Sequence, residues 1–274
     1  MRILLQTTRY QVKHPILKPL IKYFWLIESG QQITVNHQLL PVNNIDLIFN
    51  LSSPIKYITA NQIEIIPEGF HFNGIRKQAY QINQAGNLKI LGISFWPTGL
   101  YPFLKTPLSE FTNQTVELDL LVNKFTSRIE ERLAVTESIP EKFALLENEL
   151  VRLVNPKLFP TNQTEKIFEK FYFSTDSLQI EDFCQQYGIG QRKLERIFHK
   201  YVGVSPKLFF KLNRFQRTLK QLLKKQYLNL TSLAYENHYY DQTHFIKEFK
   251  SFTGCSPSQF LRQGASVKDI IIYK

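Results

Sequence analysis

Apolar residues follow one spacing in the first part of the chain and another in the rest. Short runs rich in β-branched and aromatic residues, separated by turn residues, fall at 20–29, 31–41, 45–53, 55–67, 70–82 and 88–96. Later, at 118–134 and 140–154, apolar residues recur every three or four positions. A spacing of two predicts strands, and a spacing near 3.6 predicts helices. The pattern therefore predicts an all-β barrel or sandwich followed by helices.

The C-terminal third contains two copies of one pattern, in residues 178–209 and 228–260. Gly203-Val204-Ser205-Pro206 recurs 51 residues later as Gly254-Cys255-Ser256-Pro257, and the apolar positions around each anchor also match. Each copy predicts a short helix, a tight turn and a second helix, which is the helix-turn-helix pattern. A matched pair of such units is typical of proteins that bind double-stranded DNA, with each second helix in the major groove.

Polar side chains occupy the outer face of the second helix in each unit. They are Arg192, Glu195, Arg196 and Lys200 in the first unit, and Gln242, Thr243, His244 and Lys247 in the second. Arginine can bond bidentately to guanine, and amide, hydroxyl, imidazole and ammonium groups suit base edges and phosphates. Glu195 is expected to accept from a cytosine amine or to hold Arg196. We predict that these eight residues contact DNA.

A long helix is predicted between the two units. Ser205 is a good N-cap and Pro206 suits the first helical position, so the helix begins there. The stretch that follows is rich in Lys and Arg, which would face phosphates. Gly188 and His238 fall in the two turns, and Asp241 is a good N-cap for the second recognition helix.

Charge is concentrated in the part that carries the repeat. The net charge is +11, and residues 161–274 contribute +8 of it, from 18 Lys/Arg against 10 Asp/Glu. This asymmetry is the electrostatic footprint expected of a phosphate-binding domain.

Several function classes are not indicated. The two cysteines predict a reduced, cytoplasmic setting, and no apolar run is long enough for a signal peptide or a membrane span. No nucleophile elbow, phosphate-binding loop or zinc-protease motif is present, so neither catalysis nor a cofactor is expected. His14, His37 and His71 lack a close His-x-His pair, so no metal site is predicted.

The stretches GQRKLERIFHKYVGVSPKLF, LNRFQRTLKQLL and YYDQTHFIKEFKSFTGCSPSQF resemble the AraC/XylS family of transcription regulators over residues 161–263. The resemblance implies seven helices with two helix-turn-helix motifs joined by a long central helix, and it implies that the positions named above, all except Lys200, read bases. The chain departs from the family at His238, where Gly is usual, and at Gly190, where Ser or Thr commonly caps the helix. We expect an α+β multidomain chain, with a DNA-binding domain at 161–274.

Residues 1–155 resemble the cupin-like sensor half of such regulators, in LPVNNIDLIFNLS, LGISFWPTG and PLSEFTNQTVELD. The resemblance implies a small barrel for a small-molecule effector, with helices that form a homodimer. The alternatives are a fully packed barrel, and helices that only cover it. The residues that would line a pocket or belong to the core are Phe49, Phe70, Phe72, Phe95 and Trp96.

Three hypotheses follow. The first is a sequence-specific transcription regulator whose N-terminal domain controls DNA occupancy, and the second is a cupin-type enzyme or small-molecule-binding protein with a structural helical domain. Clustered histidines would favour the second, and they are missing. The third is an architectural DNA protein without sequence preference, which the polar mix of Gln242, Thr243 and His244 disfavours.

Overall fold

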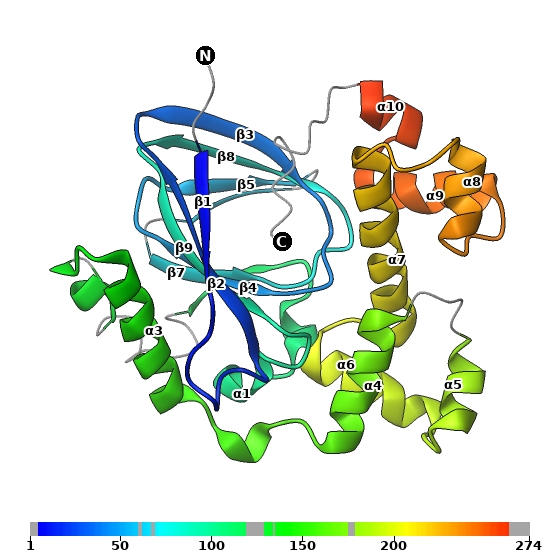
Figure 1. Cartoon of the computed structure of the whole chain (residues 1–274), viewed down its shortest axis with the longest axis horizontal. Helices are drawn as coiled ribbons and strands as arrows, with labels where there is room; N and C mark the ends of the chain where they lie inside the picture. Colours follow the sequence, from blue (N-terminus) through cyan, green and yellow to red (C-terminus); the bar gives the residue numbers. More distant parts are fainter. Residues whose placement is uncertain are drawn as a thin grey trace.

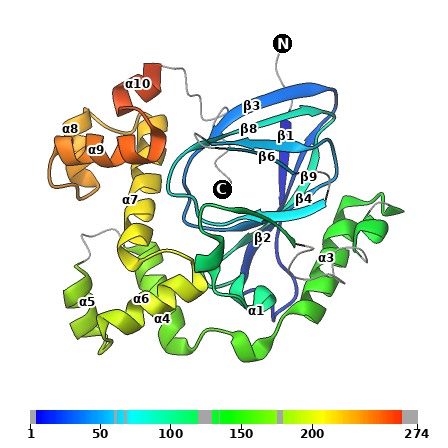
Figure 2. The same ribbon diagram turned by 180° about the vertical axis from the view of Figure 1, so that it is seen from behind.

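The computed structural model describes residues 5–59, 62–66, 69–118, 129–133, 135–174 and 179–262. Figures 1 and 2 show two facing sheets with α3 on one side and the helices α4 to α10 on the opposite side. The chain therefore combines an N-terminal β domain with C-terminal helices, as the change in apolar spacing predicts.

The β domain contains a six-stranded and a four-stranded sheet, and every pairing in them is antiparallel. The first has the order β1 (Leu5–Tyr10), β2 (Ile21–Ser29), β9 (Lys89–Phe95), β4 (Asp46–Asn50), β7 (Gly69–Asn73) and β10 (Thr115–Glu117). The second has the order β3 (Ile33–Leu39), β8 (Tyr80–Gly86), β5 (Ile55–Ile58) and β6 (Ile63–Ile66). The run at 55–67 thus forms a hairpin of two strands, β5 and β6. The run at 70–82 contributes β7 and the start of β8.

The two faces of the six-stranded sheet pack against different partners. Trp25 and Ile48 face the four-stranded sheet, where they join Tyr57 in one buried cluster. On the opposite face, Phe24 packs against Phe143 of α3 (Ile139–Leu153), with ring centroids 5.5 Å apart. Because successive side chains of a strand point to opposite faces, β2 contributes side chains to both hydrophobic clusters.

The phenylalanines proposed as pocket or core residues belong to the core. Phe49 and Phe70 pack edge to face, 4.3 Å apart. Phe72 and Phe95 contact Phe111 of η1 (Leu108–Phe111) and Phe103 of α1 (Tyr101–Leu104), respectively, at 5.3 and 5.6 Å. These rings lie beneath the short helices rather than between the sheets. Trp96 is half-buried, with its ring against Tyr172.

The predicted helix at 140–154 is confirmed as α3. Most of the other predicted stretch, 118–134, lies outside the described residues, which are helical from 129 to 133. No helix in the described ranges is both long enough and apolar enough to cross a membrane.

The C-terminal part is all-helical over its described residues. It comprises η3 (Pro156–Leu158), α4 (Asn162–Phe173), α5 (Ile180–Gln186), α6 (Gln191–Tyr201), α7 (Pro206–Leu223), α8 (Leu230–Glu236), α9 (Gln242–Thr253) and α10 (Pro257–Arg262). The pairs α5–α6 and α8–α9 are the two predicted helix-turn-helix units, and α7 is the predicted long helix between them. Ser205 caps α7 by accepting from the Leu208 amide at 3.3 Å.

Candidate nucleic-acid interface

The second recognition helix, α9, has a complete cap at each end. The Asp241 carboxylate accepts a hydrogen bond from the His244 amide at 2.6 Å, as predicted for an N-cap. Gly254 ends the helix with φ of 84°, a left-handed conformation that favours glycine. Phe245 and Phe249 are fully buried, and Phe249 packs 5.5 Å from Phe215 of α7. The inner face of α9 is thus fixed against α7, which leaves its outer face for a partner.

A buried ion pair joins α9 to α7. Arg214 donates from Nε and Nη2 to the two carboxylate oxygens of Glu248, at 3.0 and 2.5 Å. The side chains are 8% and 3% exposed, respectively. A bidentate pair fixes orientation as well as distance, and removing one partner would leave a buried charge. Arg214 is therefore a positioning residue for the second recognition helix, α9.

The same arginine also fixes the turn before α9. Its Nη1 donates to the His238 carbonyl at 3.2 Å, and its guanidinium lies 4.2 Å from the centroid of the Tyr239 ring. His238 has φ of 57°, so it adopts the left-handed conformation expected at this turn although it is not glycine. Arg217 supports the neighbouring residue by donating from Nε to Asn237 Oδ1 at 3.0 Å. Sequence reasoning missed both arginines as positioning residues, because their partners are 20 to 34 positions away.

The first recognition helix, α6, is held by apolar packing. Leu194 and Phe198 are fully buried, and Phe198 lies 4.6 Å from Phe168 of α4. Gly190 occupies the N-cap without a side-chain hydrogen bond, as its identity requires. The preceding turn contains Gly188 with φ of 58°, as predicted.

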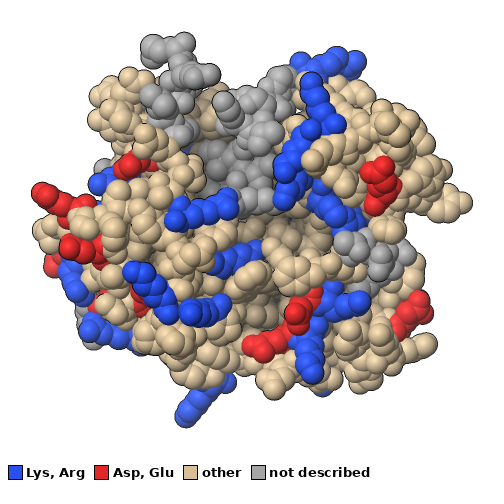
Figure 3. Space-filling view, viewed as in Figure 1, with Lys and Arg blue, Asp and Glu red and all other residues tan. Residues whose placement is uncertain are grey.

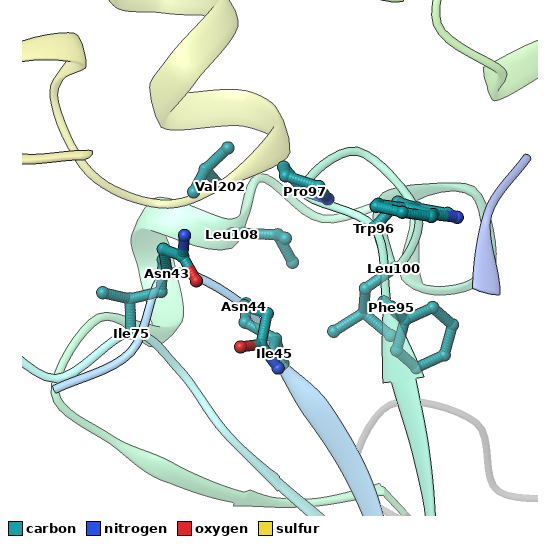
Figure 4. A pocket seen from close by; sticks show the side chains of 10 residues that line it. All are labelled: Asn43, Asn44, Ile45, Ile75, Phe95, Trp96, Pro97, Leu100, Leu108 and Val202. Atoms are coloured by element: carbon teal, nitrogen blue, oxygen red, sulfur yellow. The ribbon is translucent and has the colours of Figure 1, made fainter. Parts of the chain in front are cut away.

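The C-terminal end of α6 contacts the β domain. Thr112 donates from its hydroxyl to the Gly203 carbonyl at 2.6 Å. Figure 4 shows Val202 from the end of α6 lying over Leu108 and Pro97, and these residues line a cavity of about 10 Å³. A cavity of that size holds about one water molecule, so the contact is close.

Helix α7 also contacts the β domain through its polar side chains. Gln216 donates from Nε2 to the Pro41 carbonyl, and Asn43 donates to Asn213. The amide of Ala79 donates to the carbonyl of Phe252, at the end of α9, at 2.9 Å. The β domain thus reaches both recognition helices and the helix between them.

The eight predicted DNA contacts divide by exposure. The exposed residues are Arg192, Glu195, Arg196, Thr243 and Lys247, and the half-buried ones are Lys200, Gln242 and His244. Figure 3 shows Lys and Arg side chains over both halves of this face, with a continuous run of them at the upper right, where the C-terminal helices lie. Each recognition helix therefore keeps at least two of the predicted side chains on an open face.

The three half-buried residues already have partners. Lys200 places its ammonium 4.6 Å from the centroid of the Tyr101 ring, in the β domain. Gln242 accepts at Oε1 from the Thr231 hydroxyl at 2.7 Å, which leaves its amide N–H groups as donors. His244 accepts at Nδ1 from the Tyr240 amide at 3.2 Å. That bond requires the neutral imidazole to carry its proton on Nε2.

Glu195 accepts from Gln191 at 3.4 Å, one turn earlier on α6. Arg192 and Arg196 on the same helix are exposed. The predicted roles of the eight residues stay predictions.

His71 lies in the core of the β domain. His71 is fully buried, and its Nε2 lies 2.8 Å from the Tyr57 hydroxyl. Burial lowers the pKa of His71 to about 3, so its imidazole is neutral near pH 7. Among the described residues, no three His, Cys, Asp or Glu side chains are grouped so that they could hold a metal ion.

Two regions of the chain match known domain families. Residues 183–263 match a family described as a helix-turn-helix domain, and residues 13–117 match a domain of unknown function (DUF6597). The first match covers both helix-turn-helix units except the start of α5, together with α7.

Curated relatives match between about a third and three fifths of the chain. The transcriptional activator AarP of Providencia stuartii is 26% identical over 98 residues, covering 36% of this chain and 72% of AarP. The transcriptional regulator ExsA of Pseudomonas aeruginosa is 26% identical over 171 residues, covering 61% and 58%. The Msm operon regulatory protein of Streptococcus mutans is 29% identical over 102 residues, covering 37% and 36%. The chain thus spans less than two thirds of the last two proteins.

Solved structures of ToxT from Vibrio cholerae are similar over most of the chain. One has a TM-score of 0.47 and 15% identity, and the match covers 86% of this chain and 99% of ToxT. The two helix-turn-helix units on one central helix, together with the domain and sequence matches, show that the C-terminal part is a helix-turn-helix domain similar to those of transcription regulators, which supports the resemblance to the AraC/XylS family.

Proposed function

We propose that this protein binds specific DNA sequences by placing α6 and α9 in successive segments of the major groove. The observation that carries the proposal is the pair of recognition helices held on α7, each with exposed polar side chains. Arg192 and Arg196 suit guanine edges in one segment. Thr243 and Lys247 suit a base edge and a phosphate in the other.

We further propose that the bound protein activates transcription. AarP carries the description of a transcriptional activator, as does VirF of Yersinia enterocolitica, which is 26% identical over 100 residues. The similarity lies in about a third of this chain, so the test is transcription from a promoter that carries the selected site. A fall in the amount of transcript when the protein is present would show that the protein represses transcription instead.

Control by the N-terminal domain is the third part of the proposal. Thr112 bonds to the end of the first unit, and the loop that contains Pro41 bonds to α7. A small molecule that favours one arrangement of these contacts would shift DNA affinity by its differential affinity for the two states.

The direct test is selection of bound sequences from a random DNA pool by the full chain. The proposal expects one enriched motif, and affinity that falls steeply with salt as counterions are released. Strong binding that enriches no motif would identify an architectural DNA protein instead. Absence of binding at low salt would contradict the proposal as a whole.

A further inference from the structure

A small polar cleft opens at the edge of the space between the two sheets. Its volume is about 40 Å³, which is room for roughly three water molecules. One wall is the loop from Leu40 to Val42, Ile48 and Ile75 add apolar lining, and the polar lining comes from Asn44, Asp46, Asn73, Arg76 and Tyr80. This cleft is distinct from the recognition helices, and no feature of the DNA interface accounts for its charged lining.

Asp46 is a buried carboxylate held by neutral donors. Trp25 donates from Nε1 at 3.1 Å, and Asn44 donates from Nδ2 at 2.6 Å. Burial raises the pKa of Asp46 to about 6, against smaller opposing effects from hydrogen bonds and from Lys22. At neutral pH the group is therefore still mostly ionised, and its burial is costly unless a cation compensates it.

Lys22 already uses its ammonium elsewhere. It donates to the Tyr172 hydroxyl at 2.5 Å and lies 5.0 Å from the centroid of the Trp96 ring. The ammonium is thus directed to the boundary between the β domain and α4.

Arg76 is the second charged group in the cleft, and its side chain is 5% exposed. Its Nη2 donates to Glu64 at 3.1 Å, and the guanidinium lies 4.4 Å from the centroid of the Tyr80 ring. Its Nε is buried, and no acceptor for it lies among the described residues. Since Glu64 balances the charge of Arg76, the lining carries one net negative charge, that of Asp46, which Lys22 offsets only from outside the lining.

We propose that this cleft binds a small organic cation that carries a primary ammonium group. The ammonium group would pair with the Asp46 carboxylate, which lies in the lining. Charge-assisted hydrogen bonds of this kind are about twice as strong as neutral ones. The volume limits the ligand to a few heavy atoms unless the loop at Leu40 to Val42 moves.

A ligand in the cleft would affect the position of the DNA-binding helices through that loop. Pro41 accepts from Gln216 of α7, and Asn43 bonds to Asn213, so the wall of the cleft is also part of the domain contact. This consequence for DNA affinity rests on the proposed function, whereas binding in the cleft does not.

Trp25 provides a reporter, because its indole donates directly to Asp46 and the chain has only two tryptophans. In the full chain with Trp96→Phe, fluorescence would be titrated with 3-amino-1-propanol and with 1,3-propanediol, its neutral analogue of nearly equal size. We expect a saturable change with the amino alcohol and at least tenfold weaker binding of the diol. Calorimetry on the unmodified chain would repeat the comparison without any substitution.

Asp46→Asn should abolish the preference for the amino alcohol, whereas Glu117→Gln, at an exposed carboxylate on β10, should keep it. Equal binding of the diol and the amino alcohol would overturn the cationic ligand class. No response to either by fluorescence and calorimetry would overturn the site itself.

DNA affinity measured in the same samples separates the two proposals. A protein that binds the amino alcohol but no DNA would contradict only the proposed function. One that binds DNA but neither compound would contradict only the site.

Discussion

The two helix-turn-helix units repeat one sequence pattern, yet different interactions hold them. The first relies on apolar packing of α6 and on the β domain, which contacts Gly203 and Lys200. The second relies on the buried pair of Arg214 and Glu248, and on the Asp241 cap. The β domain therefore helps to hold the first recognition helix, whereas it contacts the second only at the end of α9, where the Ala79 amide bonds to Phe252, and charges inside the C-terminal part hold the rest.

The repeated glycine shows the same contrast at one position. Gly203 and Gly254 both have left-handed backbones, with φ of 90° and 84°. A side-chain Cβ at Gly203 would lie 2.6 Å from the Leu108 carbonyl oxygen, whereas at Gly254 it would meet nothing within 4 Å. The glycine is needed in both copies for the helix end, and in the first copy also for the domain contact.

Arg214→Met should have the largest effect and should act on the second unit. It would leave the buried Glu248 carboxylate without its two short hydrogen bonds and with only Lys211 and His244 at 3.8 Å, at a cost of about 3 kcal/mol in the free energy of unfolding. Urea unfolding of the full chain measures this loss. Arg192→Met, at an exposed site on α6, is the matched control and should change stability by less than about 0.5 kcal/mol.

The double variant Arg214→Met/Glu248→Leu sharpens this prediction. It removes both buried charges, so it should recover much of the lost stability. A single variant as stable as the unmodified protein would show that the pair does not hold α9.

The glycine pair should give the next largest effect. Gly254→Ala should cost about 1 kcal/mol, because alanine is strained at positive φ. Gly203→Ala should cost about 1–3 kcal/mol more, because its methyl group would overlap Leu108 and push the domains apart. Equal losses in urea unfolding would mean that the domain contact at Gly203 contributes nothing to stability.

Helix caps should give the smallest effects, of opposite sign in the two units. Asp241→Ala removes a cap bond and should cost about 1 kcal/mol. Gly190→Ser would add the missing cap to α6, where a side chain meets no atom within 4 Å, and should stabilise by a few tenths of a kcal/mol. Thermal unfolding of both variants tests the pair, and a destabilised Gly190→Ser protein would contradict the assigned cap.

The local features of the C-terminal part were predictable from sequence. The apolar spacing, Ser205, Asp241 and the two Gly-x-Ser-Pro anchors each specify a helix or its end through neighbouring residues. The left-handed His238 was predictable too, although the carbonyl bond from Arg214 was not. Pairs such as Arg214 with Glu248 join distant positions, and helical spacing does not choose among the available partners.

In the β domain, alternation predicted strands but could not assign their faces. Phe72 and Phe95 could equally have pointed between the sheets or away from them, and they point toward η1 and α1. The polar cleft at Asp46 was missed for the same reason. A single carboxylate among apolar residues becomes a site only when Arg76 is brought to it from a different segment.

We propose that the two helix-turn-helix units, although different interactions hold them, bind two segments of one DNA site. Sequence selection with the unmodified chain and with Arg196→Ala tests it most directly. We expect a motif of two blocks whose centres lie about 10 base pairs apart, with Arg196→Ala removing base preference in one block only, at a cost of about 1–3 kcal/mol. A motif with a single block, or one that Arg196→Ala leaves unchanged, would contradict the claim.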